Sequence, residues 1–314
     1  MSTINNVTLS AGTTTVASTA TVVDFTELDQ TSIKALGVGV FTSLTLADAQ
    51  KISADAFAGI TNVQLAAIST TVFNGLSTDQ ISSLSTANIA ALTSAKVQAL
   101  STKQLMALDN TQIAGFTLTQ VAALTTSQVS KLSNDQIGSL NSVGLTGVQI
   151  STLSTSQISA LSTKQLSGLS TTQIASLNTD DMKSLSDEQI SSLTNSQVSA
   201  LSTQQVSALF AMQSLGLSAT QVQYISTRAI ASLTTSYLSQ LDENAMIALS
   251  DTQVKALSST QLNGLSEVNF QAIEGRDIAA ISASTLATVS TAKINRLGSA
   301  QVYWSNTFWT VDVT

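Results

Sequence analysis

Cysteine, histidine and proline are all missing from this chain of 314 residues. Without cysteine the chain forms no disulfide and has no thiolate to act as nucleophile or metal ligand. Without histidine it lacks the commonest general base and metal-binding side chain. Without proline, no residue rigidly interrupts a regular backbone. These absences leave few routes to enzymatic chemistry.

Charge is also scarce: 10% of the residues are charged, 4% are aromatic, and the net charge is -7. The 12 Lys and Arg residues are scattered and form no basic stripe, so we expect no nucleic-acid partner. No apolar run approaches the roughly 20 residues that span a bilayer, so we expect no membrane span. A sparsely charged surface suits a protein that packs against copies of itself.

An eight-residue repeat runs through most of the chain. An apolar residue recurs at every eighth position from Leu28 to Leu140, and the pattern resumes from Leu153 to Leu297. A fixed short period predicts a stack of equivalent units, each of which buries its apolar side only against its neighbours. The phase break between 140 and 153 contains two glycines and predicts a wider turn or a register slip.

Within a unit, position one is the recurring apolar residue, position two is usually Ser or Thr, and position six is again apolar. Ser or Thr followed three residues later by Gln is a capping box, in which each side chain accepts a backbone N–H at a helix start. Its repetition predicts that a new helix begins in each unit. The fifth position is most often glutamine, as in Gln104, Gln112, Gln120, Gln128, Gln157, Gln165 and Gln173.

One continuous helix is excluded by geometry. At about 100° per residue, eight residues leave an apolar stripe about 80° out of register with the previous unit, so no single face could be buried. The chain must therefore turn between units. Each helix is then under two turns long and depends on its neighbours for stability. We expect the small residue at position eight to let adjacent helices approach closely.

The predicted fold is therefore an all-α repeat solenoid of very short capped helices, one per octad, with β-like segments at both ends. A β-solenoid is the alternative, because Ser, Thr, Val and Ile are frequent. Against it, the apolar spacings of five and three are both odd. Successive apolar residues on one strand would then point to opposite faces.

We divide the chain into a β-rich N-terminal arm (1–27), the solenoid (28–297) and an aromatic C-terminal cap or tail (298–314). The two end segments either cover the open ends of the core or add to a neighbouring subunit. The candidate assembly residues are their larger apolar side chains: Val7, Val16, Val22, Val23, Phe25, Tyr303, Trp304, Phe308, Trp309, Val311 and Val313.

No catalytic constellation is recognisable, and we predict no enzyme activity and no cofactor. The densest acidic cluster comprises Asp180, Asp181, Asp187 and Glu188, which are weak candidates for a surface calcium site because hard cations prefer oxygen ligands. Acidic residues in a first helical turn are also favoured by the helix dipole. The sequence alone leaves both interpretations open.

The Leu-Ser-Thr-x-Gln-Ile-x-x unit, seen in Leu161-Ser-Thr-Lys-Gln-Leu-Ser-Gly, resembles repeats of large bacterial secreted and cell-surface proteins. The stretch Phe308-Trp-Thr-Val-Asp-Val-Thr looks like the uncleaved C-terminal signal of type I secretion substrates. The resemblance implies an extracellular or cell-surface location, reached without an N-terminal signal peptide.

These observations predict a secreted structural protein that assembles with copies of itself into a filament, sheath or surface layer. The alternative is a secreted adhesin, a binding module for a glycan, a peptide, or a cell-surface or matrix component. The monotony of the solvent-exposed Ser, Thr, Ala and Lys favours assembly.

Overall fold

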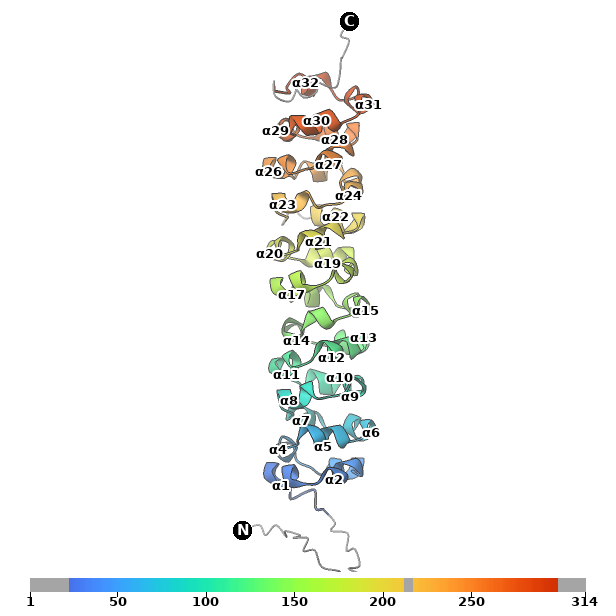
Figure 1. Cartoon of the computed structure of the whole chain (residues 1–314), viewed down its shortest axis with the longest axis vertical. Coiled ribbons are helices and arrows are strands. Elements are labelled where there is room, and N and C mark those ends of the chain that lie inside the picture. The colour runs from blue at the N-terminus through green and yellow to red at the C-terminus, as the bar shows by residue number, and fades with distance from the viewer. Residues whose placement is uncertain (1–22, 212–216, 299–314) are drawn as a thin grey trace, which may run out of the picture.

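The computed structural model describes residues 23–211 and 217–298, which form one long, straight stack of short helices (Figure 1). These residues contain 32 α-helices and one 3-10 helix, and no strand. The all-α repeat solenoid is confirmed. The β-solenoid alternative is wrong for this part of the chain, because its units form short helices and none of the described residues is in a strand. Residues 1–22 and 299–314, which hold most of the predicted β-like segments, lie outside the described residues.

Most of the described helices begin with the capping box that the repeat predicts. In α13 (Thr126–Val129), the Thr125 side chain accepts the Gln128 N–H, and the Gln128 side chain accepts the Thr125 N–H. The preceding Leu124 and Thr125 are both extended, with ψ of 140° and 156°. Two extended residues therefore make the corner between consecutive helices. No described residue has a positive φ, which explains why the corners need no glycine.

Three helices complete one coil, because each helix packs against the helix three units later in the chain. The solenoid therefore has three flanks, each a stack of helices from successive coils. The first flank comprises α1 (Gln30–Ala35), α4 (Ala54–Phe57), α7 (Thr78–Ser82), α10 (Thr102–Met106), α13, α15 (Gly147–Ile150), α18 (Thr171–Ala175), α21 (Asn195–Ser199), α23 (Ala219–Val222), α26 (Glu243–Ile247), α29 (Glu267–Ala272) and α32 (Thr291–Ile294).

The second flank comprises α2 (Val38–Thr42), α5 (Asn62–Ala67), α8 (Thr86–Ala90), α11 (Asn110–Ala114), α14 (Asn134–Ser139), α16 (Thr155–Ser159), α19 (Thr179–Ser184), α22 (Thr203–Phe210), α24 (Thr227–Ser232), α27 (Asp251–Lys255) and α30 (Gly275–Ala280). The third flank comprises α3 (Leu46–Ala49), α6 (Thr70–Asn74), α9 (Ser94–Ala99), α12 (Leu118–Ala123), η1 (Ser142–Gly144), α17 (Thr163–Gly168), α20 (Asp187–Ser191), α25 (Thr235–Leu238), α28 (Ser259–Gly264) and α31 (Ala283–Leu286).

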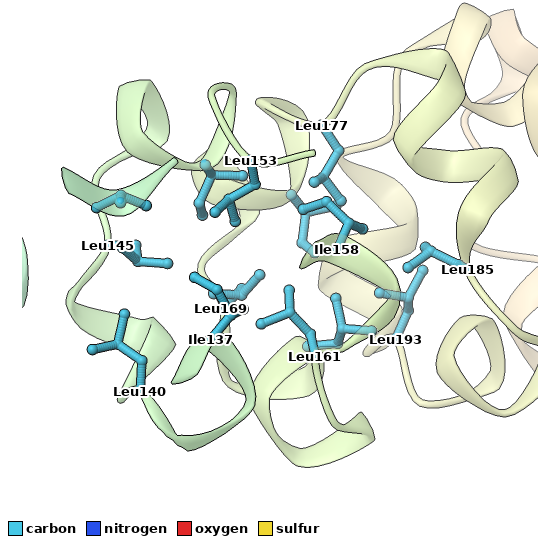
Figure 2. Packing of buried hydrophobic residues seen from close by; sticks show 14 of the residues in the cluster. Ile137, Leu140, Leu145, Leu153, Ile158, Leu161, Leu169, Leu177, Leu185 and Leu193 are labelled. Carbon is cyan, nitrogen blue, oxygen red and sulfur yellow. The ribbon is translucent and has the colours of Figure 1, made fainter. Parts of the chain in front are cut away.

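The apolar residues of positions one and six fill the interior of this triangular coil. Leu161 and Leu166, for example, are 3% and 0% exposed. They belong to one core cluster that runs from Ile33 to Val289, part of which is shown in Figure 2. Burying one such side chain stabilises the fold by about 1.5–3 kcal/mol. Helices of four to eight residues are unstable on their own, so this burial supplies the free energy that keeps them folded.

The small residue at position eight has the predicted role. Gly264 ends α28, and a Cβ there would overlap the side chain of Thr235 in the coil before it. A Cβ on Gly115 would lie 3.1 Å from the Gln112 carbonyl oxygen and 3.5 Å from that of Thr86, in the preceding coil. Position eight therefore rests on position three of the helix one coil earlier, and a larger side chain would separate the coils.

The phase break is shorter than the sequence pattern indicates. Leu145 is buried, at 3% exposure, and precedes Leu153 by one octad, so the irregular unit is confined to residues 140–144. This five-residue unit holds η1 in place of an α-helix. The stack continues through it, because η1 packs against α12 on one side and α17 on the other. Leu140, Leu145 and Leu153 lie in the same packed core (Figure 2).

None of the helices in the described ranges is both long and apolar enough to cross a bilayer.

Candidate assembly surfaces

The glutamine at position five joins each coil to the previous one. Gln128 is 3% exposed, and its Oε1 accepts the Thr125 N–H at 2.7 Å. Its Nε2 donates to the carbonyls of Val97 at 2.9 Å and Leu100 at 2.7 Å, at the C-terminal end of α9. One side chain thus satisfies an amide at the start of its own helix and also donates to two carbonyls at the end of another helix.

This arrangement recurs along the solenoid as a glutamine ladder. Its members all accept the N–H of the N-cap residue and donate to carbonyls in the preceding coil: Gln64, Gln80, Gln104, Gln112, Gln120, Gln128, Gln136, Gln149, Gln157, Gln165, Gln173, Gln189, Gln197, Gln205, Gln221, Gln253 and Gln261. Because hydrogen bonds of buried amides are directional, the ladder fixes the register of one coil on the next.

The capping box was predicted from the sequence, and the bond between coils was not. The sequence signal that could have predicted the bond between coils is the presence of glutamine, and not glutamate, at position five. Either residue completes a capping box, but only glutamine also carries an amide donor. Lysine replaces that donor at two positions: the Lys96 amine donates to the Ala66 carbonyl at 2.9 Å, and the Lys293 amine donates to the Leu265 carbonyl.

The first described coil lacks the ladder. Position five is occupied by Ser32, Val40, Asp48 and then Ala56, and the first glutamine of the ladder is Gln64. No described coil precedes Ser32, Val40 and Asp48, so no carbonyls of an earlier coil require a donor there; Ala56 belongs to α4, the first helix of the second coil. The absence of glutamine matches the place where the described stack starts.

The four candidate metal ligands do not converge. Asp180 and Asp181 lie on α19 of the second flank, whereas Asp187 and Glu188 lie on α20 of the third. Asp180 forms an ion pair with Lys183 at 3.4 Å, and Asp181 takes the ladder position. The pKa of Glu188 is lowered, mainly by its own backbone N–H and by the Ser186 hydroxyl. Across the described ranges, no three acidic side chains are placed to hold a metal ion.

Two ladder positions carry a buried acid. Asp181 is 1% exposed and accepts the Asn178 N–H at 2.9 Å, but it has no amide to donate to the coil before it. Burial raises the pKa of Asp181 above its ordinary value. Asp277 is equally buried, and burial raises its pKa although the Arg276 guanidinium, 3.1 Å away, opposes the rise. Because a buried carboxylate is costly to ionise, each of these two residues lowers the stability of the fold at neutral pH.

The five-residue unit leaves a groove on the third flank. Gln149, Gln157 and Gln165 span the break and reach carbonyls 25 residues back instead of 28, and Gln173 returns to 28. The three missing residues are therefore the first helical turn of the unit. The resulting groove has a volume of about 380 Å³ and is lined by Gly138, Ser139, Leu140, Asn141, Ser142, Val143, Ser162, Lys164 and Gln165.

Two side chains in the groove depart from the repeat. Gln165, unlike most ladder glutamines, is partly exposed, because no helical turn lies beneath it. Ser142 occupies the register of the apolar sixth position; it is 1% exposed and its Oγ lacks a hydrogen-bond partner among the described residues. The break is thus the most irregular surface of the described solenoid.

The third flank is nearly without exposed charge. Apart from the ion pair between Asp48 of α3 and Lys51, which follows that helix, at 2.9 Å, its described exposed charges are Lys164 on α17 and Asp187 and Glu188 on α20. Lys96 is buried in α9. We call this surface the low-charge flank. It also exposes apolar side chains, with Leu118 and Val143 each 47% exposed.

Of the candidate assembly residues, two lie within the described chain. Val23 is partly buried, and Phe25 is partly buried and packs against the end of the core beside Leu28. Phe25 thus contributes to its own subunit. The others, Val7, Val16, Val22, Tyr303, Trp304, Phe308, Trp309, Val311 and Val313, lie outside the described residues.

Comparison with known proteins supports the repeat architecture. Three segments, residues 57–94, 145–179 and 174–210, are similar to the ALTTAQ repeat. The second segment begins at Leu145, where the octad resumes after the break. The matched segments cover less than half of the chain. No curated protein matches the chain.

Proposed function

We propose that the chain is a structural subunit that assembles with copies of itself into an extracellular filament, sheath or surface layer. The observation that carries the proposal is the scarcity of exposed charge on the low-charge flank. Its exposed positions repeat short hydroxyl and apolar side chains in one register over successive coils, with almost no charge. Such a surface offers little electrostatic resistance to side-by-side packing.

Rigidity also supports a structural role. The core and the glutamine ladder continue without interruption across the five-residue unit, so a rod of fixed register is presented to neighbouring copies. In repeat proteins, such neighbour contacts add up along the stack. The proposed extracellular location rests on the resemblance of the octad and of the C-terminal stretch to those of secreted proteins.

A secreted binding module is the second candidate, and the groove at the break favours it. The groove interrupts a regular surface with the Lys164 amine, the Gln165 amide and several hydroxyls, and polar groups of this kind bind sugars or peptides. An adhesin would use this one place, whereas an assembly subunit would use a whole flank.

Electron microscopy of the purified chain, beside variants that lack residues 1–27 or 303–314, separates the two candidates. Ordered filaments or sheets of the intact chain would support a structural subunit, and their loss on truncation would show that the end segments lock the assembly. Single dispersed rods in all three samples would overturn assembly and favour the binding module.

A further inference from the structure

Two of the exposed charges on the low-charge flank, one positive and one negative, occupy equivalent positions in adjacent coils. Lys164 and Glu188 each occupy position four of their unit and lie on α17 and α20, which pack against each other in adjacent coils. Both side chains are exposed, and both belong to the third flank. Neither forms an ion pair within the described residues. The flank thus presents one cation and one acidic site, a single coil apart.

The groove makes Lys164 accessible. Because the first helical turn of the five-residue unit is missing, Lys164 projects over the groove instead of over a neighbouring helix. A side chain from another molecule can therefore reach the Lys164 amine through the groove as well as from the outer surface of the flank. Asn141 and Ser139 line the same groove and add polar groups around the approach.

We propose that this flank is a self-complementary contact between two antiparallel copies, in which Lys164 of each copy pairs with Glu188 of the other. The inference rests on the proposed assembly and names the surface that performs it. A two-fold axis that lies in the plane of the contact, at right angles to the long axis of the solenoid and level with the space between α17 and α20, exchanges the two coils. Each cation then faces a carboxylate, and the contact closes after two copies.

The other side-by-side arrangements are less favourable. Parallel copies in register place Lys164 beside Lys164 and Glu188 beside Glu188, which is repulsive. Parallel copies shifted by one coil form one pair instead of two. Exposed ion pairs contribute little free energy, so they select the orientation while the uncharged surface, including Leu118 and Val143, supplies the contact area.

Charge reversal tests the pairing. In Lys164→Glu, two carboxylates face each other at both ends of the contact, and in Glu188→Lys, two amines do. We expect each single variant to raise the dissociation constant of the dimer about tenfold or more. The double variant, Lys164→Glu with Glu188→Lys, restores opposite charges and should return the constant to near that of the original chain. Sedimentation velocity over a range of concentrations measures all four.

The matched control is Lys103→Glu, which reverses the charge of an exposed position-four lysine on α10 of the first flank. It should leave dimerisation unchanged, and circular dichroism should show every variant folded. Association of the original chain that is insensitive to both reversals overturns the proposed pairing while leaving assembly intact. So does a double variant as weak as the single ones. A chain that is monomeric throughout overturns assembly itself.

Discussion

The side-chain amide of Gln205 donates to the backbone carbonyl of Leu177, 2.9 Å away and 28 residues earlier in the chain. The same amide donates to Ile174, and the Gln205 Oε1 accepts the Ser202 N–H. One side chain therefore ties the start of α22 to the end of α18 in the preceding coil. Because the bond recurs along the stack, it determines how the solenoid is assembled from units that are unstable alone.

Replacing Gln205 by alanine should destabilise the solenoid locally by roughly 2–4 kcal/mol. The substitution leaves the Ser202 N–H and the Leu177 carbonyl without their partner in a buried setting, and each unsatisfied group costs about 1–3 kcal/mol. Gln204→Ala is the control, since Gln204 is the exposed neighbour in the same helix. Hydrogen exchange of α18 and α22 should accelerate in the first variant and stay unchanged in the second. Equal exchange in both would contradict the structural role of the ladder.

Asp181→Gln should stabilise the chain at neutral pH by about 1–3 kcal/mol, because glutamine supplies the amide donor that the buried acid lacks. Burial raises the pKa of Asp181 in the folded chain, so the folded state keeps this proton to a higher pH than the unfolded state does. The original chain therefore gains stability as the pH falls through the folded pKa, up to the unfolded value near about 3.9.

The advantage of Asp181→Gln should accordingly shrink between pH 7 and about pH 4, as urea denaturation at several pH values would reveal. The charged groups nearest to Asp181 are Asp180 and Lys183 on its own helix, while α16 and α22, which pack against it, carry none. Asp180→Asn, a change at the exposed neighbour, is the control. A pH-independent advantage would show that Asp181 is ionised throughout.

Lys96→Gln should raise stability at neutral pH by about 1 kcal/mol. Burial lowers the pKa of Lys96, because the charged amine loses hydration in the folded chain. Keeping Lys96 charged at neutral pH therefore reduces the stability of the fold. Glutamine would keep a donor for the preceding coil and would also accept the Thr93 N–H, thereby completing the capping box that α9 lacks. Thermal denaturation beside the exposed control Lys103→Gln measures the gain. An unchanged or lower melting temperature would argue against the ladder geometry at α9.

Replacing each of two glycines by alanine should change the stability of the fold in opposite directions. A Cβ on Gly59 would lie 2.6 Å from the Cα of Gln30, so Gly59→Ala forces neighbouring coils apart and should destabilise by about 1–3 kcal/mol. A Cβ on Gly39, inside α2, meets no atom within 4 Å. Gly39→Ala should therefore stabilise by about 0.5–1 kcal/mol through helix propensity. Denaturation midpoints that move in the same direction would contradict the close approach of coils at position eight.

The helices and their caps were predictable because they depend on neighbours in sequence. Ser or Thr followed three residues later by Gln defines a helix start locally, and the eight-residue period excludes a continuous helix. The number of helices per coil was not predictable, since it depends on the angle at the extended pair of residues, such as Leu124 and Thr125. The groove was not predictable either. The missing helical turn is evident only from the hydrogen bonds of Gln165 and its neighbours, which reach carbonyls 25 residues back instead of 28.

The acidic cluster illustrates the same limit. Asp181 and Asp187 are close in sequence, but the corner between α19 and α20 assigns them to different flanks, and Asp181 points inward at the ladder position. Sequence proximity therefore indicated a cluster that the three-sided coil separates. Conversely, the corner and the stacking bring Lys164 and Glu188, 24 positions apart in the sequence, onto one face.

Self-association is the central claim, and the mass of the intact chain in solution tests it most directly. Light scattering of the purified protein over a wide concentration range should show masses that rise above the 32.5 kDa of one chain, first to a dimer and then to larger species. A mass that stays at 32.5 kDa at every concentration would contradict the claim and leave the groove at the break as the functional surface.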